Sequence, residues 1–324
     1  MKALVNRKYG SLKSLTIEEV PTPSIKSDEV LVKVKAVSIN DWDLGMIKGS
    51  SFVNRMQSGL FKPKLQILGS DVAGVVVSVG SEVTKFRIGD RVYGDLSNNQ
   101  FGGFAEYTAT YEKHLCHMPE SMPFDIAAAI PQAGMLAYQA LYDFIEIRDG
   151  MRILINGAGG GVGTYAVQML RDLNVHLTGV DAEVKREMLL SMGYNAFKDY
   201  KKVDFTKLAD KYDLIIDCKT NKPLSKYAKV LNDDGMYITI GGDMIKVIRI
   251  LLGSKSLEKK YGRKYNCVQL STNRNLPEIN QLYEEGKLTS IIDPRRFTLL
   301  SGREAMTYYA SGEHLGKVLI VIEE

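Results

Sequence analysis

The stretch Asn156-Gly157-Ala158-Gly159-Gly160-Gly161-Val162-Gly163 decides the fold of this chain. It follows the apolar run 153–155 and opens an apolar helical pattern that extends to Leu173. In a strand–turn–helix unit, small residues permit a tight turn and let the backbone approach a pyrophosphate, and Gly163 brings the helix close to the strand. The stretch therefore predicts a dinucleotide-binding loop. A plain strand–turn–helix is the alternative, because Ala158 replaces the first glycine of the strict GxGxxG pattern.

Apolar segments of strand and helix length alternate beyond this loop. We expect strands at 175–180, 213–217 and 236–240, and a helix at 183–192. Parallel strands that are buried on both faces read as continuous apolar runs, and these runs alternate with helices. The middle of the chain therefore predicts a parallel, doubly wound α/β sheet.

Residues 1–120 have a different, β-rich character. The segment 30–37 alternates apolar and polar side chains like a half-buried strand. We expect no long helix before about residue 123. The tail has a helical pattern at 276–285 and ends in a strand at 317–322. This strand either returns to the first domain or continues its sheet.

The composition is typical of a globular protein in water, with 45% hydrophobic and 25% charged residues and a net charge of +4. Basic residues are scattered except between 249 and 264, so nucleic acid is not an expected partner. The three cysteines form no CxxC pair and no disulfide framework. The N-terminus begins with strand-like sequence, and no apolar run reaches the roughly 18 residues of a membrane span. We therefore expect a reduced, cytoplasmic enzyme.

From Gly150 to Arg171 the chain resembles the segment characteristic of quinone oxidoreductases and zeta-crystallin. The resemblance extends to further motifs at 38–40, 68–76, 89–94, 103–107 and 316–318. The chain is thus similar to the zinc-free, quinone-oxidoreductase-like branch of the medium-chain dehydrogenase/reductase family. The resemblance implies a GroES-like β-barrel catalytic domain at 1–122 and 275–324, and a Rossmann domain at 123–274. It also implies a nicotinamide cofactor in the cleft between them, and a homodimer.

Residues after the second predicted Rossmann strand bear on the choice of cofactor. Asp181 can accept both ribose hydroxyls and would repel a 2′-phosphate, which favours NADH; its alternative role is a helix N-cap. Lys185 and Tyr200 stand where similar quinone oxidoreductases hold the 2′-phosphate, and Arg186 adds a cation. An ordinary solvated helix start is the alternative for the two cations. Because two family positions agree, the balance favours NADPH.

Zinc alcohol dehydrogenases of this superfamily hold the metal with a Cys, a Gly-His-Glu and a later Cys. Here the first position is Asn40, the second is Ser70-Asp71, and the segment 131–134 has no thiol. Catalytic zinc needs three protein ligands, and two of these replacements are poor ones. Three other candidate ligands lie close together, but strand alternation would place His114 and Cys116 on one face and His117 on the other. We therefore predict no metal site.

Without a metal, the substrate carbonyl needs another hydrogen-bond donor at its developing negative charge. By resemblance the candidate is Asn40, whose amide donates without titrating; its alternative role is a turn residue. Asp43 matches the family's aspartate and is expected to orient the cofactor or the loop. Asp41 and Met46 depart from the family pattern, so the proton donor stays open between solvent and a ribose hydroxyl.

Three further positions are expected near the nicotinamide. Gly241 and Gly242 end a predicted strand, where the backbone can approach the ring closely. Lys317 matches a family position near the cofactor, with a surface lysine as its alternative. Trp42, the only tryptophan, either lines the cleft or fills the core.

The segment 244–255 combines apolar residues with interspersed cations. We favour a helix that lines an apolar substrate pocket. The alternatives are an interface helix and a helix on a membrane surface.

The expected function is NAD(P)H-dependent reduction of a quinone or an α,β-unsaturated carbonyl. One rival is a zinc-independent alcohol or carbonyl dehydrogenase. A rival from another class is a nucleotide-sensing binding protein with little catalysis. The cofactor loop together with Asn40 favours an enzyme.

Overall fold

The computed structural model describes residues 1–98 and 101–323. The chain forms two compact units, one made of Met1–Met135 with Ser271–Glu324 and the other of Leu136–Leu270. It passes from the first unit to the second within helix α4 (Pro131–Tyr142). The borders expected for the two domains, at 122/123 and 274/275, stay predictions. No helix among the described residues is both long and apolar enough to cross a membrane.

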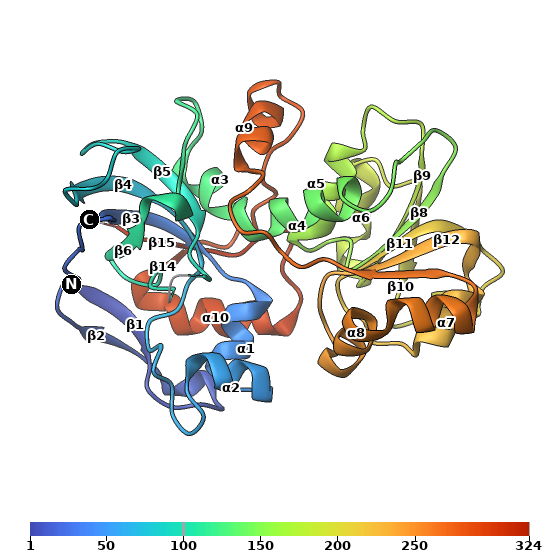
Figure 1. Cartoon of the computed structure of the whole chain (residues 1–324), viewed down its shortest axis with the longest axis horizontal. Helices are drawn as coiled ribbons and strands as arrows, with labels where there is room; N and C mark the ends of the chain where they lie inside the picture. The colour runs from blue at the N-terminus through green and yellow to red at the C-terminus, as the bar shows by residue number, and fades with distance from the viewer. Residues whose placement is uncertain (99–100, 324) are drawn as a thin grey trace. The chain divides into compact units, whose positions relative to one another are not determined.

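The second unit is built on one sheet of six parallel strands (Figure 1). The strands are β8 (Arg152–Asn156), β9 (His176–Asp181), β10 (Ala196–Asp199), β11 (Tyr212–Asp217), β12 (Leu231–Thr239) and β13 (Lys264–Cys267). Their spatial order is β10-β9-β8-β11-β12-β13. Counted from β8, this is the 3-2-1-4-5-6 order of a doubly wound dinucleotide-binding sheet. The predicted fold class of this part is confirmed.

Helices cover both faces of this sheet. Figure 1 shows α5 (Gly161–Met169) and α6 (Arg186–Ser191) on one side, and α7 (Leu224–Lys229) and α8 (Met244–Tyr261) on the other. Strands β10 and β13 were not predicted. Their sequences, Ala-Phe-Lys-Asp and Lys-Tyr-Asn-Cys, lack an apolar run because both strands lie at the sheet's edges.

The first unit is mostly antiparallel β-structure. Its main sheet has the order β14-β15-β3-β4-β5-β7, with β6 paired to β3, and β1 and β2 form a separate hairpin. The bounds are β1 (Lys2–Asn6), β2 (Leu15–Glu19), β3 (Glu29–Ser38), β4 (Asp71–Val79), β5 (Arg91–Asp95), β6 (Tyr107–Tyr111), β7 (Cys116–His117), β14 (Phe297–Thr298) and β15 (Leu319–Val321). Alternate residues of β3 enter the core, as the alternation predicts: Val30, Val32, Val34 and Ala36 are buried.

The C-terminal strand β15 returns to the first unit, where Leu319 pairs with Ser38 of β3. The helices of this unit are α1 (Asp41–Lys48), α2 (Phe52–Ser58), α3 (Phe124–Ala129), α9 (Leu276–Glu284) and α10 (Gly302–Ser311). The helices α1 and α2 are short, in keeping with the expectation of no long helix before about residue 123, although the β-rich sequence did not predict them individually. Asn40 begins α1 because its backbone N–H donates to the carboxylate of Asp43, three residues on, as in a capping box.

Candidate active site

The glycine loop of the second unit joins β8 to α5. Gly157 has φ +90°, a conformation that favours glycine. A Cβ at Gly163 would lie 2.2 Å from the Ala158 carbonyl oxygen, so the helix can approach the strand only if this residue is glycine. Gly160 is the N-cap of α5, and its nearest neighbour would be 3.5 Å from an added Cβ. The loop thus has the tight turn, the close helix and the open N-terminus that phosphate binding requires.

Asp181 and Lys185 form a buried ion pair beside this loop. The Lys185 Nζ lies 3.4 Å from Asp181 Oδ1, and the two side chains are 5% and 10% exposed. Asp181 Oδ2 accepts a hydrogen bond from the Gly159 backbone N–H at 2.8 Å. A Cβ at Gly159 would meet the Lys185 side chain at 2.5 Å. Lys185 is therefore packed against the loop, unlike the solvated lysine that the sequence left as an alternative.

Tyr200 directly follows β10, and its backbone N–H donates to the Asp181 carbonyl at 3.1 Å. Its own side chain is 55% exposed. Arg186 is exposed and pairs with Glu183. The structure thus brings Asp181, Lys185 and Tyr200 together at the carboxyl ends of β9 and β10, where the ribose end of a nucleotide lies in this fold.

A buried polar network that was not predicted joins the ends of β8, β11 and β12. Asp217 Oδ1 accepts hydrogen bonds from Asn156 Nδ2 and from the Thr220 backbone N–H, at 2.8 and 2.9 Å. Asp217 Oδ2 accepts one from the Tyr237 hydroxyl at 2.9 Å. Burial and the neighbouring Asp217 carboxylate raise the pKa of Tyr237 far above its usual value, so Tyr237 stays a donor. The polar residues that end successive strands were the available signal.

The two glycines after β12 differ in their surroundings. Gly242 has φ +102°, and a Cβ there would lie 1.9 Å from the Lys219 carbonyl oxygen. Gly241 has no atom within 4 Å of such a Cβ, and its carbonyl accepts the Thr220 hydroxyl. Gly242 is therefore required by the fold, whereas Gly241 leaves open space beside the ends of the parallel strands.

The first unit places Asn40 and Asp43 together at the start of α1. Asn40 is 5% exposed and Asp43 is fully buried. Asp43 Oδ2 accepts the Asn40 backbone N–H, and its Oδ1 accepts the Gly69 backbone N–H, both at 3.0 Å. Burial raises the pKa of Asp43 to about 7, although these two hydrogen bonds oppose the shift. Asp43 thus ties α1 to the segment before β4.

Lys317 lies against Asn40 from the C-terminal part of the chain. Its Nζ donates to Asn40 Oδ1 at 2.5 Å and to the Ile39 carbonyl at 3.4 Å. It is 3.6 Å from Asp71 Oδ2. Lys317 is 3% exposed, so the alternative of a surface lysine is wrong. Its assignment to the cofactor stays a prediction, because the contacts of its Nζ among the described residues are with groups of the first unit.

The positions that replace the zinc ligands form one hydrogen-bonded cluster. Asn40 Nδ2 donates to Ser70 Oγ at 3.1 Å, and Ser70 Oγ donates to Asp71 Oδ1 at 3.4 Å. Asp71 Oδ2 also accepts hydrogen bonds from Ser38 Oγ and from the Gln132 backbone N–H. Burial raises the pKa of Asp71, and the charge of Lys317 opposes this shift.

Asp95, which was not predicted, lies beside Asp71 because the two residues are paired across β4 and β5. Its Oδ1 accepts the Ser97 backbone N–H at 2.8 Å. Its Oδ2 is buried and has no hydrogen-bond partner among the described residues. Burial, and then the charge of Asp71, raise the pKa of Asp95 to about 7.

The described residues contain no group of three or more His, Cys, Asp or Glu side chains that could hold a metal ion. The ring of His114 is buried, and its Nδ1 lies 3.3 Å from Thr110 Oγ1. Cys116 is half-buried, and its Sγ accepts a hydrogen bond from Asn280 Nδ2. His117 is exposed, and its ring packs on Phe86.

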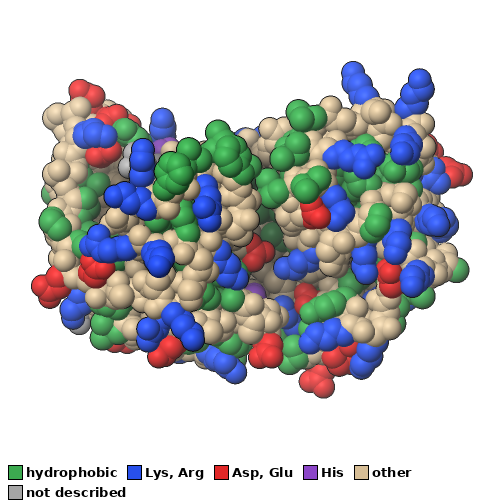
Figure 2. Space-filling view, turned by 90° about the horizontal axis from the view of Figure 1, so that it is seen from below, with side chains coloured by type: hydrophobic (Ala, Val, Ile, Leu, Met, Phe, Trp, Pro, Cys, Tyr) green, Lys and Arg blue, Asp and Glu red, His purple; other side chains and the backbone are tan. Residues whose placement is uncertain are grey.

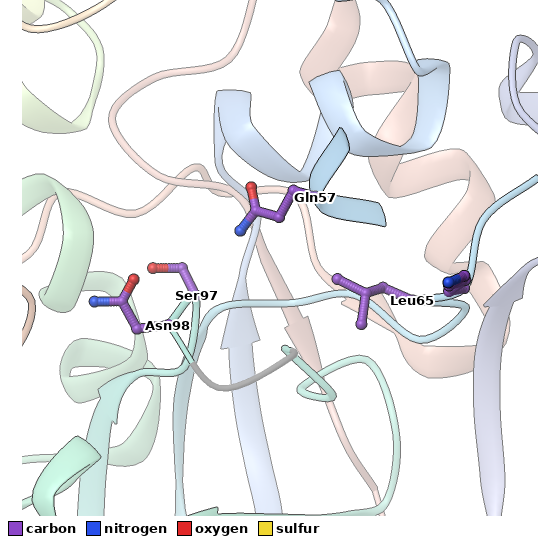
Figure 3. Close-up of a pocket in the computed structure, with 5 residues that line it drawn as sticks. Gln57, Leu65, Ser97 and Asn98 are labelled. Atoms are coloured by element: carbon purple, nitrogen blue, oxygen red, sulfur yellow. The ribbon is translucent and has the colours of Figure 1, made fainter. Parts of the chain in front are cut away.

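A polar pocket of about 490 Å³ opens in the first unit (Figure 3). Its lining comes from α2, from the loop after α2 and from the residues that follow β5: Gln57, Lys64, Leu65, Ser97 and Asn98.

Trp42, on α1, packs against the hydrophobic core of this unit. Its Nε1 has no hydrogen-bond partner in the part of the chain that the structure describes. The structure therefore gives Trp42 a core role.

The segment 244–255 forms most of α8, with a non-helical residue at Gly253. Val247 and Ile250 are buried, whereas Ile245 and Leu252 are 81% and 85% exposed. Its favoured role as a helix that lines an apolar pocket stays a prediction, as do the two alternatives, an interface helix and a helix on a membrane surface.

On the face of the molecule in Figure 2, Lys and Arg side chains are dispersed among acidic and apolar ones, and they do not gather in one patch.

Family models match both parts of the chain. Residues 26–120 match the alcohol dehydrogenase GroES-like domain, and residues 192–320 match the zinc-binding dehydrogenase domain. The chain is 33% identical to a 2-methylene-furan-3-one reductase of Solanum lycopersicum, over 99% of this chain and 79% of that protein. It is 30% identical to a chloroplastic NADPH-dependent alkenal/one oxidoreductase of Arabidopsis thaliana, with the same coverage.

Solved structures agree with these relatives. A quinone oxidoreductase from Coxiella burnetii superposes with a TM-score of 0.89 at 26% identity, over 100% of this chain and 99% of that one. Its likeness confirms the expected pairing of a GroES-like domain with a Rossmann domain.

The relatives overturn the expectation of a cytoplasmic protein. Several of them are named as chloroplastic or mitochondrial proteins. The expectation rested on composition and on the absence of sequence features. Such an absence cannot assign a compartment.

Proposed function

The chain belongs to the quinone-oxidoreductase-like branch of the medium-chain dehydrogenase/reductase family, and from this premise we propose that it transfers hydride from NAD(P)H to a quinone or an α,β-unsaturated carbonyl without zinc. When bound, the nicotinamide supplies the hydride, and solvent or a ribose hydroxyl supplies the proton that completes the reduction. The residues of the chain bind the nucleotide, orient the acceptor and stabilise the negative charge that develops on its oxygen.

The observation that carries this proposal is the buried Asn40 amide, held between Lys317 and Ser70. An amide is neutral at every pH of interest, so it donates a hydrogen bond without exchanging a proton. In the proposal, the N–H of Asn40 that donates to Ser70 turns to the substrate oxygen. Ser70 keeps Asp71 as its partner during this exchange.

The test is the oxidation of NADPH and NADH with three acceptors: a quinone, an enal and a saturated aldehyde. We expect turnover with the quinone or the enal. Turnover of the aldehyde alone would indicate a carbonyl dehydrogenase. Tight binding of the nucleotide without turnover of any acceptor would indicate a nucleotide sensor.

Replacing Asn40 with Ala tests the role of the amide. We expect kcat to fall by roughly 10² to 10³, the effect of removing one donor to a developing oxyanion. The NADPH dissociation constant, measured by fluorescence, should stay within about twofold, since only the substrate oxygen loses a donor. A weakened NADPH affinity with an unchanged kcat would contradict this role.

For the cofactor we propose NADPH in preference to NADH. The Asp181 carboxylate is paired with Lys185 and with the Gly159 backbone N–H, which reduces its repulsion of a 2′-phosphate. The relative named NADPH-dependent supports the same choice. A fluorescence titration with both nucleotides tests it, and tighter binding of NADH would overturn it.

We propose that the working form is a homodimer that acts on a small, apolar carbonyl or quinone. Strand β13 at the sheet's edge and the exposed apolar side chains of α8 support a second copy as partner. Light scattering of the purified protein tests this, and a monomeric mass would refute it.

A further inference from the structure

Lys317 is a buried cation whose contacts, among the residues that the structure describes, belong to one small cluster. Its Nζ donates to Asn40 Oδ1 and to the Ile39 carbonyl, and Asp71 Oδ2 is 3.6 Å away. Lys317 is 3% exposed and Asp71 is fully buried. A cation out of water is costly unless its partners compensate for the lost hydration. Both Asn40 Oδ1 and the Asp71 carboxylate are therefore needed to compensate for the hydration that Lys317 loses.

The contact with Asn40 decides how the amide is oriented. The two ends of an asparagine amide have nearly the same shape, so either end could face the substrate. An ammonium group has three donors and no acceptor, so it accommodates only the oxygen end. With Oδ1 against Lys317, the Nδ2 end donates to Ser70. The lysine thus selects the orientation in which N–H groups are available for an oxygen of the substrate.

The same contact changes the strength of the donor. A positive charge at the oxygen of an amide draws electron density away from its nitrogen. Hydrogen bonds in such a chain polarise one another, and more strongly where water is excluded. The N–H of Asn40 therefore becomes a better partner for a developing negative charge than the amide alone would be.

We propose that Lys317 is a positioning residue for hydride transfer, which acts through Asn40 by orienting and polarising its amide. The inference rests on the proposed function, because it requires Asn40 to contact the acceptor. It gives the buried ammonium a charge-stabilising task that is exerted through the amide, and it places the effect of Lys317 on the acceptor and not on the nucleotide.

The test is a double-mutant cycle between Lys317→Met and Asn40→Ala. Lys317→Met should lower kcat by roughly 10- to 100-fold, as for a lost hydrogen bond to a charged group. In the Asn40→Ala background the same change should alter kcat by less than about twofold, because the group through which it acts is gone. Lys317→Arg, which keeps the charge, should restore part of kcat. The NADPH dissociation constant should not change.

Lys317→Met leaves Asp71 without its cation, so the variant can fail to fold. A second pair keeps the test decisive: Asp71→Asn alone and Asp71→Asn with Lys317→Met. The double variant lacks both charges. Its kcat should still be lower than that of Asp71→Asn alone, as the kcat of Lys317→Met is lower than that of the wild type.

Two results would overturn the inference. One is a full additional loss of kcat on adding Lys317→Met to Asn40→Ala. The other is weaker NADPH binding at unchanged kcat, which would make Lys317 a ligand of the cofactor. If the wild-type protein reduces neither quinone nor enal, the proposed function fails and the inference fails with it. If the wild type is active and the cycle is additive, only the inference fails.

Discussion

Three carboxyl groups and one ammonium group share the interior of the first unit near Asn40. Asp43, Asp71 and Asp95 are fully buried, and Lys317 Nζ lies 3.6 Å from Asp71 Oδ2. Burial lowers the pKa of Lys317, and the charge of Asp71 opposes this shift. Burial raises the pKa of all three carboxyl groups, to about 7 for Asp43 and Asp95. Near neutral pH, partial protonation thus reduces the excess of negative charge that three carboxylates and one cation would otherwise leave among these buried side chains.

Asp95 makes a testable contribution to the pH dependence of stability. Its pKa is about 7 in the folded state and near 3.8 when exposed, so the folded protein binds more protons between these values. The free energy of unfolding should therefore fall as the pH rises through this window, by up to about 1.4 kcal/mol per pH unit for this group. Asp95→Asn should flatten the dependence between pH 4.5 and 8 and raise stability at pH 8.

Urea unfolding at several pH values measures this effect. In Asp95→Asn the oxygen of the introduced amide can still accept the Ser97 N–H, and its nitrogen replaces an oxygen that has no hydrogen-bond partner among the described residues. Asp28→Asn, at an exposed position, is the control and should leave the dependence as it is in the wild type. An unchanged slope in Asp95→Asn would show that the proton is held elsewhere in the cluster.

The pair of Asp181 and Lys185 predicts the cofactor preference of variants. Lys185→Met leaves the Asp181 carboxylate without its cation beside the glycine loop. The unpaired carboxylate should then repel a 2′-phosphate more strongly, so NADPH affinity should fall by about tenfold relative to NADH affinity. A change of this size corresponds to the loss of one hydrogen bond to a charged group. Lys229→Met is the control, because Lys229 is an exposed lysine at the end of α7, away from the glycine loop in the sequence and not assigned to the cofactor. A change of preference as large in the control would contradict the prediction.

At the scale of an element, the glycine loop separates the needs of folding from those of binding. A Cβ at Gly163 would overlap the Ala158 carbonyl oxygen, whereas at Gly160 it would meet nothing closer than 3.5 Å. Gly163→Ala should therefore lower the melting temperature. Gly160→Ala should fold like the wild type but bind NADPH at least about tenfold more weakly, since its methyl group takes space that the pyrophosphate needs. Equal nucleotide affinity in Gly160→Ala and the wild type would argue against this path for the phosphates.

Helix α8 offers a second prediction at this scale. Asp243 caps it through the Ile245 and Lys246 N–H groups, and Ile245 and Leu252 are exposed. Replacing the exposed Ile245 and Leu252 with Ser should change the free energy of unfolding by less than about 1 kcal/mol. If α8 lines an apolar pocket, the KM for a long-chain quinone should rise several-fold while that for a small enal stays the same.

Val184→Ser with Leu190→Ser removes exposed apolar side chains elsewhere in the same unit, and it serves as the control. A smaller molecular mass of the α8 variant, with both KM values unchanged, would instead identify α8 as an interface helix. Equal effects of the two variants on KM would show that α8 has no specific role in binding the acceptor.

At the scale of the whole molecule, the course of the chain assembles the cluster around Asn40. The chain leaves the first unit after Met135, forms the parallel sheet and returns at Ser271. Strand β15 then pairs with β3, and Lys317 reaches Asn40 across a separation of 277 residues. The order of the parallel strands also places Asn156 and Asp217 side by side, although 61 residues separate them.

The amino-acid sequence by itself determined the parts of this protein that depend on local geometry. The glycine loop, the alternation in β3 and the apolar strands β8, β9, β11 and β12 were predictable, because turns and periodic burial act over a few residues. The resemblance added Asn40 and Asp43 as site residues, and the structure places these two residues together.

Only the tertiary structure decided the pairing of charges. Asp95 and Asp217 are visible in the sequence as polar residues that end their strands, but the sequence does not show which groups contact them, and Lys317 read equally well as a surface residue. The energy of a charge depends on which distant groups surround it and on how much water they exclude. That information lies in the packing of strands far apart along the chain, so the electrostatic surroundings of Asn40 follow from the fold and not from any local pattern.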